Sequence, residues 1–329
     1  MKLKIIGLIG LIGLIVPMSN RAIAQDIHFS QLDVDPLLFN PAYSGFFDGF
    51  GRFGVVYRNQ WASVTTPFQT MTATAEFNIT SSKRNRNALG AGLWVSNDRA
   101  GTLNYGATTV SAIISYYQSF DRNGNNILSV ALEAGAGQSG FDVANIVLDD
   151  ASEEFVRNRA LYPVFGAGVA WFRQYSDIFY TKIGLSVRNI NEPDISYTGL
   201  TDTRLSRKYN IYARAEWRIK PQLGLMPIVG FQQQKRFSEL VYGADVRWYL
   251  REEPQDYLAF TAGLISRHGD AVSINLSVLW QRWTFAFAYD ANISKLAEAS
   301  HTLGAFEIGI LYLVPKKDKK HRALPCPII

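Results

Sequence analysis

Apolar and polar residues alternate with a period of two along most of this chain. Between 272 and 280 every second position is large and apolar, opposite Ser273, Asn275 and Ser277, and apolar residues alternate with mostly polar or small ones in the same way in 71–79, 209–218 and 283–290. A β-strand whose two faces meet different environments produces this alternation. Heptads and amphipathic helical stripes are missing. The pattern therefore predicts an all-β protein.

The predicted strands are longer than those of most globular proteins. They run about 9–14 residues, whereas globular strands usually have about 5–6 and transmembrane barrel strands about 9–11. An even number is typical of single-chain bacterial barrels. We therefore predict an outer-membrane-type antiparallel transmembrane β-barrel of about 14 strands, with 12 or 16 as alternatives. The predicted strands are 50–58, 67–79, 88–97, 104–120, 127–139, 162–175, 178–190, 206–219, 225–237, 239–250, 257–267, 271–280, 282–292 and 301–313.

The connections fall into two classes, as in outer-membrane barrels with short periplasmic turns and longer outer loops. The two longest loops, 140–161 and 191–205, fall on one side. Aromatic residues at strand ends predict an interfacial girdle; they are Trp217, Trp248, Trp280, Trp283 and Tyr312.

Charged residues occupy the polar face of these strands. An Arg or Lys that faces lipid at the membrane midplane costs about 2–4 kcal/mol, so we expect this face to point into the lumen. The charged residues are Glu76, Glu133, Lys182, Arg188, Arg214, Glu216, Arg218, Asp245, Arg247 and Glu307.

The N-terminus has the form of a secretory signal. Lys2 and Lys4 precede the apolar run 5–16, which is too short to span a bilayer, and Ala22-Ile23-Ala24 matches a cleavage site before Gln25. We therefore expect four parts: a signal peptide (1–24), a periplasmic or lumenal segment (25–49), the barrel (50–313) and a basic periplasmic tail (314–329). The expected location is the outer membrane, after cleavage near Ala24/Gln25.

The formal charge of +5 comes from the two ends of the chain. Three of the basic residues belong to the predicted signal, and the tail adds several more, so the barrel region itself is slightly acidic. We therefore predict no nucleic-acid partner. The tail lysines either form a solvated face or contact an acidic periplasmic partner; they are Lys316, Lys317, Lys319 and Lys320.

No constellation of residues points to catalysis. The four histidines lack metal-ligand spacing. Gly135, Gly137, Gly166 and Gly168 lie inside predicted strands, where close packing explains them better than phosphate binding. The run 121–126 could mimic a calcium loop but fits a turn better. We therefore predict a protein that is not an enzyme and has no catalytic residues, metal or cofactor.

Two motifs follow the signal. The first runs Phe29-Ser30-Gln31, then Pro36, then Asn40-Pro41-Ala42 with Gly45, and the second is Tyr57-Arg58-Asn59-Gln60-Trp61. Together with the barrel length and Pro325-Cys326-Pro327, this order resembles the PorP/SprF family of type IX secretion membrane proteins from Bacteroidota. In that family the last motif often continues with arginine and phenylalanine, where this chain has Ile328 and Ile329.

The resemblance implies a non-enzymatic outer-membrane barrel that serves secretion, gliding motility and cell-surface anchoring. Its partners would be the C-terminal targeting domain of a secreted cargo, such as a large adhesin, and other type IX secretion or gliding components. Candidate contacts with cargo or within the lumen are Phe29, Gln31, Asn40, Arg58, Gln60, Trp61, Arg214, Glu216 and Arg247.

The alternative function is an outer-membrane diffusion channel or hydrophobic-solute transporter, because fourteen strands also suit such channels. The sequence leaves open which cargo is bound, what closes the lumen, the oligomeric state and the role of Cys326.

Overall fold

A computed structural model describes most of the chain. The described residues are 27, 29–61, 66–82, 87–101, 105–141, 157–197, 203–253, 256–294, 300 and 302–316. The predicted signal peptide lies outside them, as does the tail from residue 317 onward.

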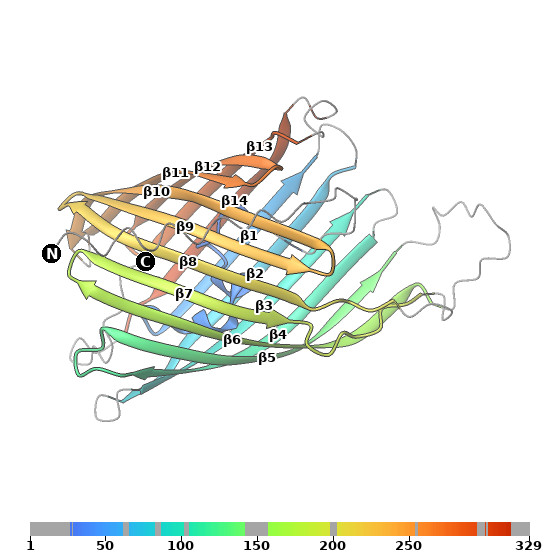
Figure 1. The fold of residues 1–329 in the computed structure, drawn as a ribbon, viewed down its shortest axis with the longest axis horizontal. Coiled ribbons are helices and arrows are strands. Elements are labelled where there is room, and N and C mark those ends of the chain that lie inside the picture. The colour runs from blue at the N-terminus through green and yellow to red at the C-terminus, as the bar shows by residue number, and fades with distance from the viewer. Residues whose placement is uncertain are drawn as a thin grey trace.

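The described residues form fourteen antiparallel strands that close into one barrel, as predicted (Figure 1). Each strand pairs with its neighbours in sequence, and β1 closes the barrel on β14. The strands are β1 (Gly51–Gln60), β2 (Phe68–Ser82), β3 (Asn87–Ala100), β4 (Tyr105–Ser119), β5 (Asn126–Gly140), β6 (Arg159–Ser176), β7 (Phe179–Arg188), β8 (Lys208–Lys220), β9 (Leu223–Gln234), β10 (Phe237–Glu253), β11 (Asp256–Arg267), β12 (Ala271–Trp280), β13 (Trp283–Asn292) and β14 (Leu303–Val314).

The alternation of the sequence becomes an outer apolar coat and a polar interior. On β12, Ile274 and Leu276 are exposed on the outside while Ser273 is buried. Eight of the ten charged residues predicted to face inward are buried, and Glu216 and Arg218 are half-buried. An outer face of large apolar side chains is what a lipid environment stabilises.

The two ends of the barrel differ. At the short-turn end, two-residue connections at 177–178, 221–222 and 281–282 join neighbouring strands. The two longest connections, 141–158 and 189–207, lie at the opposite, long-loop end. β5 and β6 extend further into the first of these loops than predicted. Trp217, Trp248, Trp280 and Trp283 are exposed on the outer face near the short-turn end.

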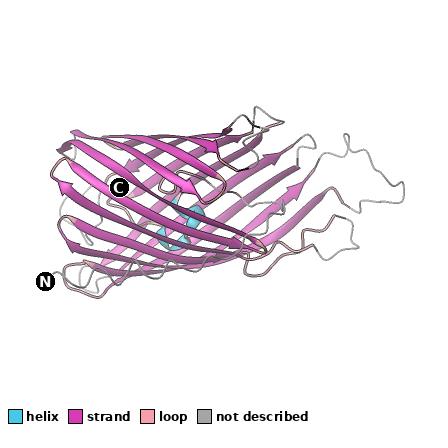
Figure 2. Cartoon of the chain, turned by 45° about the horizontal axis from the view of Figure 1, so that its top comes forward, coloured by secondary structure: helices cyan, strands magenta, loops and turns pink. Residues whose placement is uncertain are grey.

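Residues 29–47, here called the plug, lie inside the lumen and carry two short helices, α1 (Pro36–Phe39) and η2 (Pro41–Tyr43) (Figure 2). Each helix starts with a proline, whose fixed φ and missing N–H suit the first helical position. The side chains of Asp35 and Asn40 cap the two helices by accepting from the amides of Leu38 and Ala42. The sequence predicts that the segment before the barrel, 25–49, lies in the lumen or at the periplasmic mouth. Residues 29–47 of this segment lie inside the barrel.

The plug shares one apolar core with the inner wall of the barrel. Leu37, Phe39, Tyr43 and Phe46 pack with inward side chains of the strands, including Trp94, Tyr117, Phe172 and Tyr212. Phe46 stacks on Phe172 with ring centroids 3.6 Å apart. No helix within the described residues is long and apolar enough to cross a membrane.

Candidate functional site: the plugged lumen and its chamber

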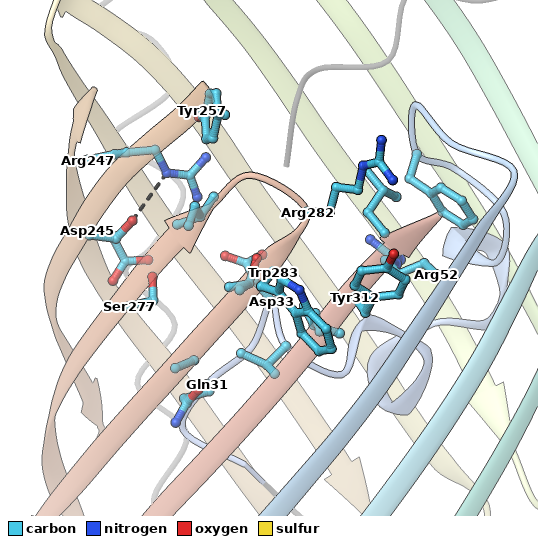
Figure 3. A pocket seen from close by; sticks show the side chains of 18 of the residues that line it. Gln31, Asp33, Arg52, Asp245, Arg247, Tyr257, Ser277, Arg282, Trp283 and Tyr312 are labelled. Atoms are coloured by element: carbon cyan, nitrogen blue, oxygen red, sulfur yellow. Dashed lines mark hydrogen bonds between the residues drawn. The ribbon is translucent and has the colours of Figure 1, made fainter. Parts of the chain in front are cut away.

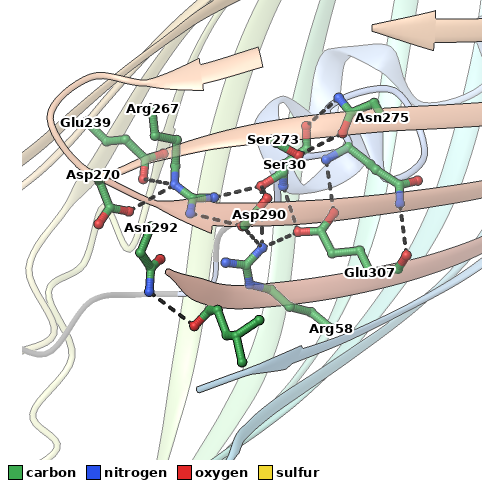
Figure 4. Close-up of polar contacts among 12 residues, drawn as sticks. Ser30, Arg58, Glu239, Arg267, Asp270, Ser273, Asn275, Asp290, Asn292 and Glu307 are labelled. Carbon is green, nitrogen blue, oxygen red and sulfur yellow. Dashed lines mark hydrogen bonds and ion pairs between the residues drawn. The ribbon is translucent and has the colours of Figure 1, made fainter. Parts of the chain in front are cut away.

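The outer cluster, defined as Ser30, Arg58, Arg267, Asp290 and Glu307, holds the start of the plug near the long-loop end (Figure 4). Arg58 forms ion pairs with Glu307 and, at 2.9 Å, with Asp290. Arg267 pairs with Asp290 at 2.9 Å. All five side chains are buried. Two arginines and two carboxylates from four strands therefore compensate one another inside the barrel.

Ser30 ties the plug to this cluster with its backbone and its side chain. Its amide donates to Glu307 Oε1 at 2.8 Å, and its hydroxyl donates to Asp290 Oδ1 at 2.7 Å. The same hydroxyl accepts from Arg267 at 2.7 Å. The amide of Gln31 adds a bond to Glu307 at 3.0 Å. Hydrogen bonds to charged groups are about twice as strong as neutral ones, so this end of the plug is firmly anchored.

Arg188 anchors α1 to the opposite wall. Its Nη2 donates to the carbonyl of Leu37 at 2.7 Å, and its Nε pairs with Glu133 at 2.9 Å. The guanidinium lies over the Trp94 ring, 4.4 Å from the centroid. The indole N–H of Trp94 donates to Asp35 Oδ2 at 3.0 Å. One arginine thus links an acid, an aromatic ring and the end of a plug helix.

Inward hydroxyl groups satisfy the carbonyls that the short helices leave without partners. Ser186 donates to Phe39, Ser129 donates to Ala42 at 2.8 Å, and Ser115 donates to Ser44 at 2.6 Å. Such pairing is required because an unpaired buried carbonyl is costly. The barrel wall is therefore matched to the backbone of this segment as well as to its side chains.

Asn40 sits where the barrel wall has no side chains. Its Nδ2 donates to the carbonyls of Val169 at 3.0 Å and Leu185 at 3.2 Å. A Cβ added at Gly168 would overlap Asn40 Oδ1, and one added at Gly184 would overlap the Tyr43 hydroxyl. Close packing, the predicted role of Gly168, is thus packing against the plug.

A chamber of about 690 Å³ lies between the plug and the short-turn end (Figure 3). The plug supplies one wall, with Gln31, Asp33 and Val34, and the strands supply the others. The turn residues Gln281 and Arg282, together with Lys316 after β14, also line it. The chamber therefore reaches the end of the barrel that carries the short turns.

Asp33 connects the plug to the polar wall of this chamber. Its carboxylate pairs with Arg214, and Lys182 Nζ lies 3.6 Å from it. Arg214 also pairs with Asp245 at 3.3 Å. These charges from the plug, β7, β8 and β10 compensate one another.

The predicted contact residues do not form one site. Phe29 and Asn40 belong to the plug core, and Arg58 to the outer cluster. Gln60 ends β1, and Trp61 follows with a positive φ and packs edge-on against Phe68. Gln31, Arg214 and Arg247 line the chamber. Glu216 accepts a hydrogen bond from the hydroxyl of the neighbouring Tyr249. Lys316 also lines the chamber, whereas Lys317, Lys319 and Lys320 lie outside the described residues.

Sequence reasoning did not single out several residues that hold the plug. Arg267 and Asp290 carry charge at inward positions, so their parity in β11 and β13 could have marked them. Ser30, Asp33 and Asp35 lie before the first strand, so no strand alternation marks their side chains as inward-facing. Their partners lie far away in sequence, as in the bond between Ser30 and Asp290 across 260 positions.

The run 121–126 is a turn, as the residue types favour. The Asp121 carboxylate accepts from the amides of Asn125 and Asn126 at 3.0 and 3.1 Å. Partial burial alone would raise the pKa of Asp121, but these bonds and one from Ser119 lower it below its usual value. Within the described part of the chain, no three His, Cys, Asp or Glu residues are grouped to hold a metal ion.

The family is decided by a match over most of the chain. Residues 22–312 match the model of the type IX secretion system membrane protein PorP/SprF. The chain belongs to the PorP/SprF family. The matched range contains the plug and almost all of the barrel. No curated protein matches the chain.

Solved structures with a similar fold are outer-membrane barrels. The toluene transporter TbuX of Ralstonia pickettii has a TM-score of 0.52 at 10% identity, covering 86% of this chain and 93% of TbuX. The P. putida toluene transporter TodX has a TM-score of 0.53 at 7% identity, covering 85% and 93%. At such low identity these similarities show the barrel fold alone. This PorP/SprF protein is thus a membrane barrel of outer-membrane type.

Proposed function

We propose that this PorP/SprF barrel binds the C-terminal targeting domain of a secreted cargo adhesin and supports its secretion and attachment at the cell surface. The observation that carries the proposal is the plug. A lumen crossed by residues 29–47, with their backbone and charges paired to the wall, is poorly suited to solute passage. Together with membership in a type IX secretion family, this favours a binding role over a conducting one.

The expected setting is the outer membrane, reached after signal-peptide cleavage near Ala24/Gln25. Short turns at one end and long loops at the other favour a periplasmic short-turn end. The chamber and Lys316 would then face the periplasm. There they would be available to cargo in transit or to other type IX secretion or gliding components.

Deletion of the gene tests the cargo role. We expect a large adhesin to disappear from the cell surface and to return when the wild-type gene is restored. Pull-down of the tagged barrel from native membranes should recover the same adhesin, and removal of the adhesin's C-terminal domain should abolish the capture. Unchanged surface display in the deletion strain would refute the proposal.

Conductance measurements distinguish the proposed cargo-binding barrel from the alternative, a diffusion channel or hydrophobic-solute transporter. The purified full-length barrel in planar bilayers should stay closed if the plug serves a binding function. A steadily open pore, or uptake of toluene into vesicles, would favour the channel. The transporters TbuX and TodX share only the fold, so their substrates supply no prediction for this chain.

A further inference from the structure

Arg247 of β10 carries a buried charge that no acid neutralises directly. Its side chain projects into the chamber (Figure 3), and the residue is only 6% exposed. Its Nε donates to Thr261 Oγ1 at 3.2 Å. Among the described residues, no carboxylate lies within ion-pair distance of it, so its two terminal nitrogens lack an acidic partner.

The other buried arginines of the described lumen each have an acid. Arg52 pairs with Glu76 and Arg188 with Glu133, and Arg58, Arg214 and Arg267 are paired as described above. The acids nearest Arg247 are engaged elsewhere. Asp245 pairs with Arg214, Glu216 accepts from Tyr249, and Glu252 pairs with Arg218 at 2.8 Å.

Glu216 and Asp245 offset part of the cost of burying the Arg247 charge, but neither forms an ion pair with its terminal nitrogens. The guanidinium presents two parallel donors that match a carboxylate or phosphate in a bidentate geometry. Because Thr261 holds the Nε, the fork formed by the terminal nitrogens is oriented in advance. Asp245 and Glu216 lie nearby, and their charge disfavours a doubly charged phosphate. The site therefore suits a single negative charge.

The rest of the chamber suits an apolar body. Val34 of the plug and the strand residues Ile228, Ile265, Leu279 and Leu311 contribute to its lining. The volume of about 690 Å³ lies within the range of about 300–1,000 Å³ that ligand pockets usually have. A ligand with a charged head and an apolar chain could bury both parts here.

We propose that the chamber binds a carboxylate attached to an apolar chain, with the carboxylate on the terminal nitrogens of Arg247. Two sources have this chemistry, the free C-terminus of an apolar peptide and a fatty acid. The inference rests on Arg247 and its surroundings, and it holds whether or not the barrel binds an adhesin.

Pairs of charged and neutral probes test whether a carboxylate is required for binding, and they show whether the ligand is a peptide C-terminus or a fatty acid. The purified full-length barrel in nanodiscs is titrated with a fluorescent apolar peptide that has a free C-terminus, and with its C-terminal amide. Labelled dodecanoate is compared with labelled dodecanol in the same way. We expect an acid to bind about tenfold tighter than its neutral partner, which corresponds to about 1.4 kcal/mol. The pair that shows this preference identifies the source.

Arg247→Gln should abolish the preference, whereas Arg247→Lys should retain part of it because the charge remains. Arg251→Gln is the matched control: Arg251 is exposed on the same strand and pairs with Asp256 at 2.8 Å, outside the chamber. Ala286→Trp, which adds bulk to the chamber wall, should weaken binding of the acid and the neutral probe alike. Heat-dependent gel mobility establishes that each variant is folded.

Two results would overturn the inference: no binding of either acid by the folded wild type, or an undiminished acid preference in folded Arg247→Gln. Loss of adhesin display has no bearing on these measurements. If the adhesin proposal fails, the Arg247 binding measurements can still be interpreted. If the Arg247 inference fails, the adhesin assays can still be interpreted.

Discussion

Single residues decide how firmly the plug is held, because its charges have partners at fixed positions on the wall. Arg58 faces both Asp290 and Glu307, and all three are almost completely buried. In such a cluster the loss of one partner matters more than the pair itself contributes, since the remaining charges stay buried without compensation.

Arg58→Met should therefore destabilise the barrel by about 3–5 kcal/mol, the usual cost of breaking a buried ion pair. Urea unfolding of the reconstituted protein, followed by tryptophan fluorescence, measures the change. Arg251→Met is the control, because its pair with Asp256 is about half exposed and should contribute at most about 1 kcal/mol. Equal unfolding midpoints for the two variants would contradict the role given to the outer cluster.

Gly168→Ala should displace Asn40 and loosen the plug, because the added Cβ would overlap Asn40 Oδ1. Forcing extra volume into a packed interior typically costs about 1–3 kcal/mol. Gly230→Ala on β9 is a matched control, because the nearest atoms there would lie 3.8 Å from the added Cβ. The same unfolding assay should separate the two variants, and a Gly168→Ala protein as stable as Gly230→Ala would refute the packing argument.

Among the structural elements, the plug is the one whose conformation is least predictable from its own sequence. Pro36 and Pro41 with the caps Asp35 and Asn40 explain where the two short helices begin. Helices this short are not stable alone in water. Their form depends on the barrel wall, which covers their apolar side chains and pairs their carbonyls.

Deletion of residues 29–47 should open the lumen. A barrel of fourteen strands is wider than the eight-stranded barrels that side chains fill, and polar groups on the inner wall would hold water. Planar bilayers should record stable conductance for the deletion protein and closed behaviour for the full-length chain. Equal conductance, with both proteins showing the gel mobility of a folded barrel, would mean that the plug does not seal the lumen.

At the scale of the whole molecule, the outer coat sets the relation to the bilayer. Leu276 faces outward near the middle of β12 and is 49% exposed, whereas the next residue, Ser277, is half-buried and shares the inward parity of the buried Ser273 and Leu279. Adjacent residues on one strand therefore meet lipid and lumen.

Leu276→Arg should destabilise the barrel by about 2–4 kcal/mol, the cost of a lipid-facing arginine at the midplane. Ser277→Arg adds the same side chain one position away, where the chamber gives it room and polar neighbours, and should cost less. Unfolding in liposomes compares them. A smaller loss for Leu276→Arg than for Ser277→Arg would mean that the two faces have been assigned the wrong way round.

The sequence was enough to predict the barrel, about fourteen strands with 12 or 16 as alternatives, and the inward face of its charges; closure of the barrel fixed the number at fourteen. These features depend on a period of two and on segment lengths, which are local properties of the chain. The PorP/SprF motifs could likewise be recognised without a structure, because they are contiguous.

Only the tertiary structure decided what the inward charges do. Ser30 reaches Asp290, Asp33 reaches Arg214 and Arg188 reaches Leu37, and every one of these contacts joins residues more than a hundred positions apart. The alternation of positions along a strand shows that a side chain faces the lumen, but it does not show which charged residue it contacts there. Barrel closure and the path of the plug bring these partners together, and the same geometry leaves Arg247 with an open guanidinium in the chamber.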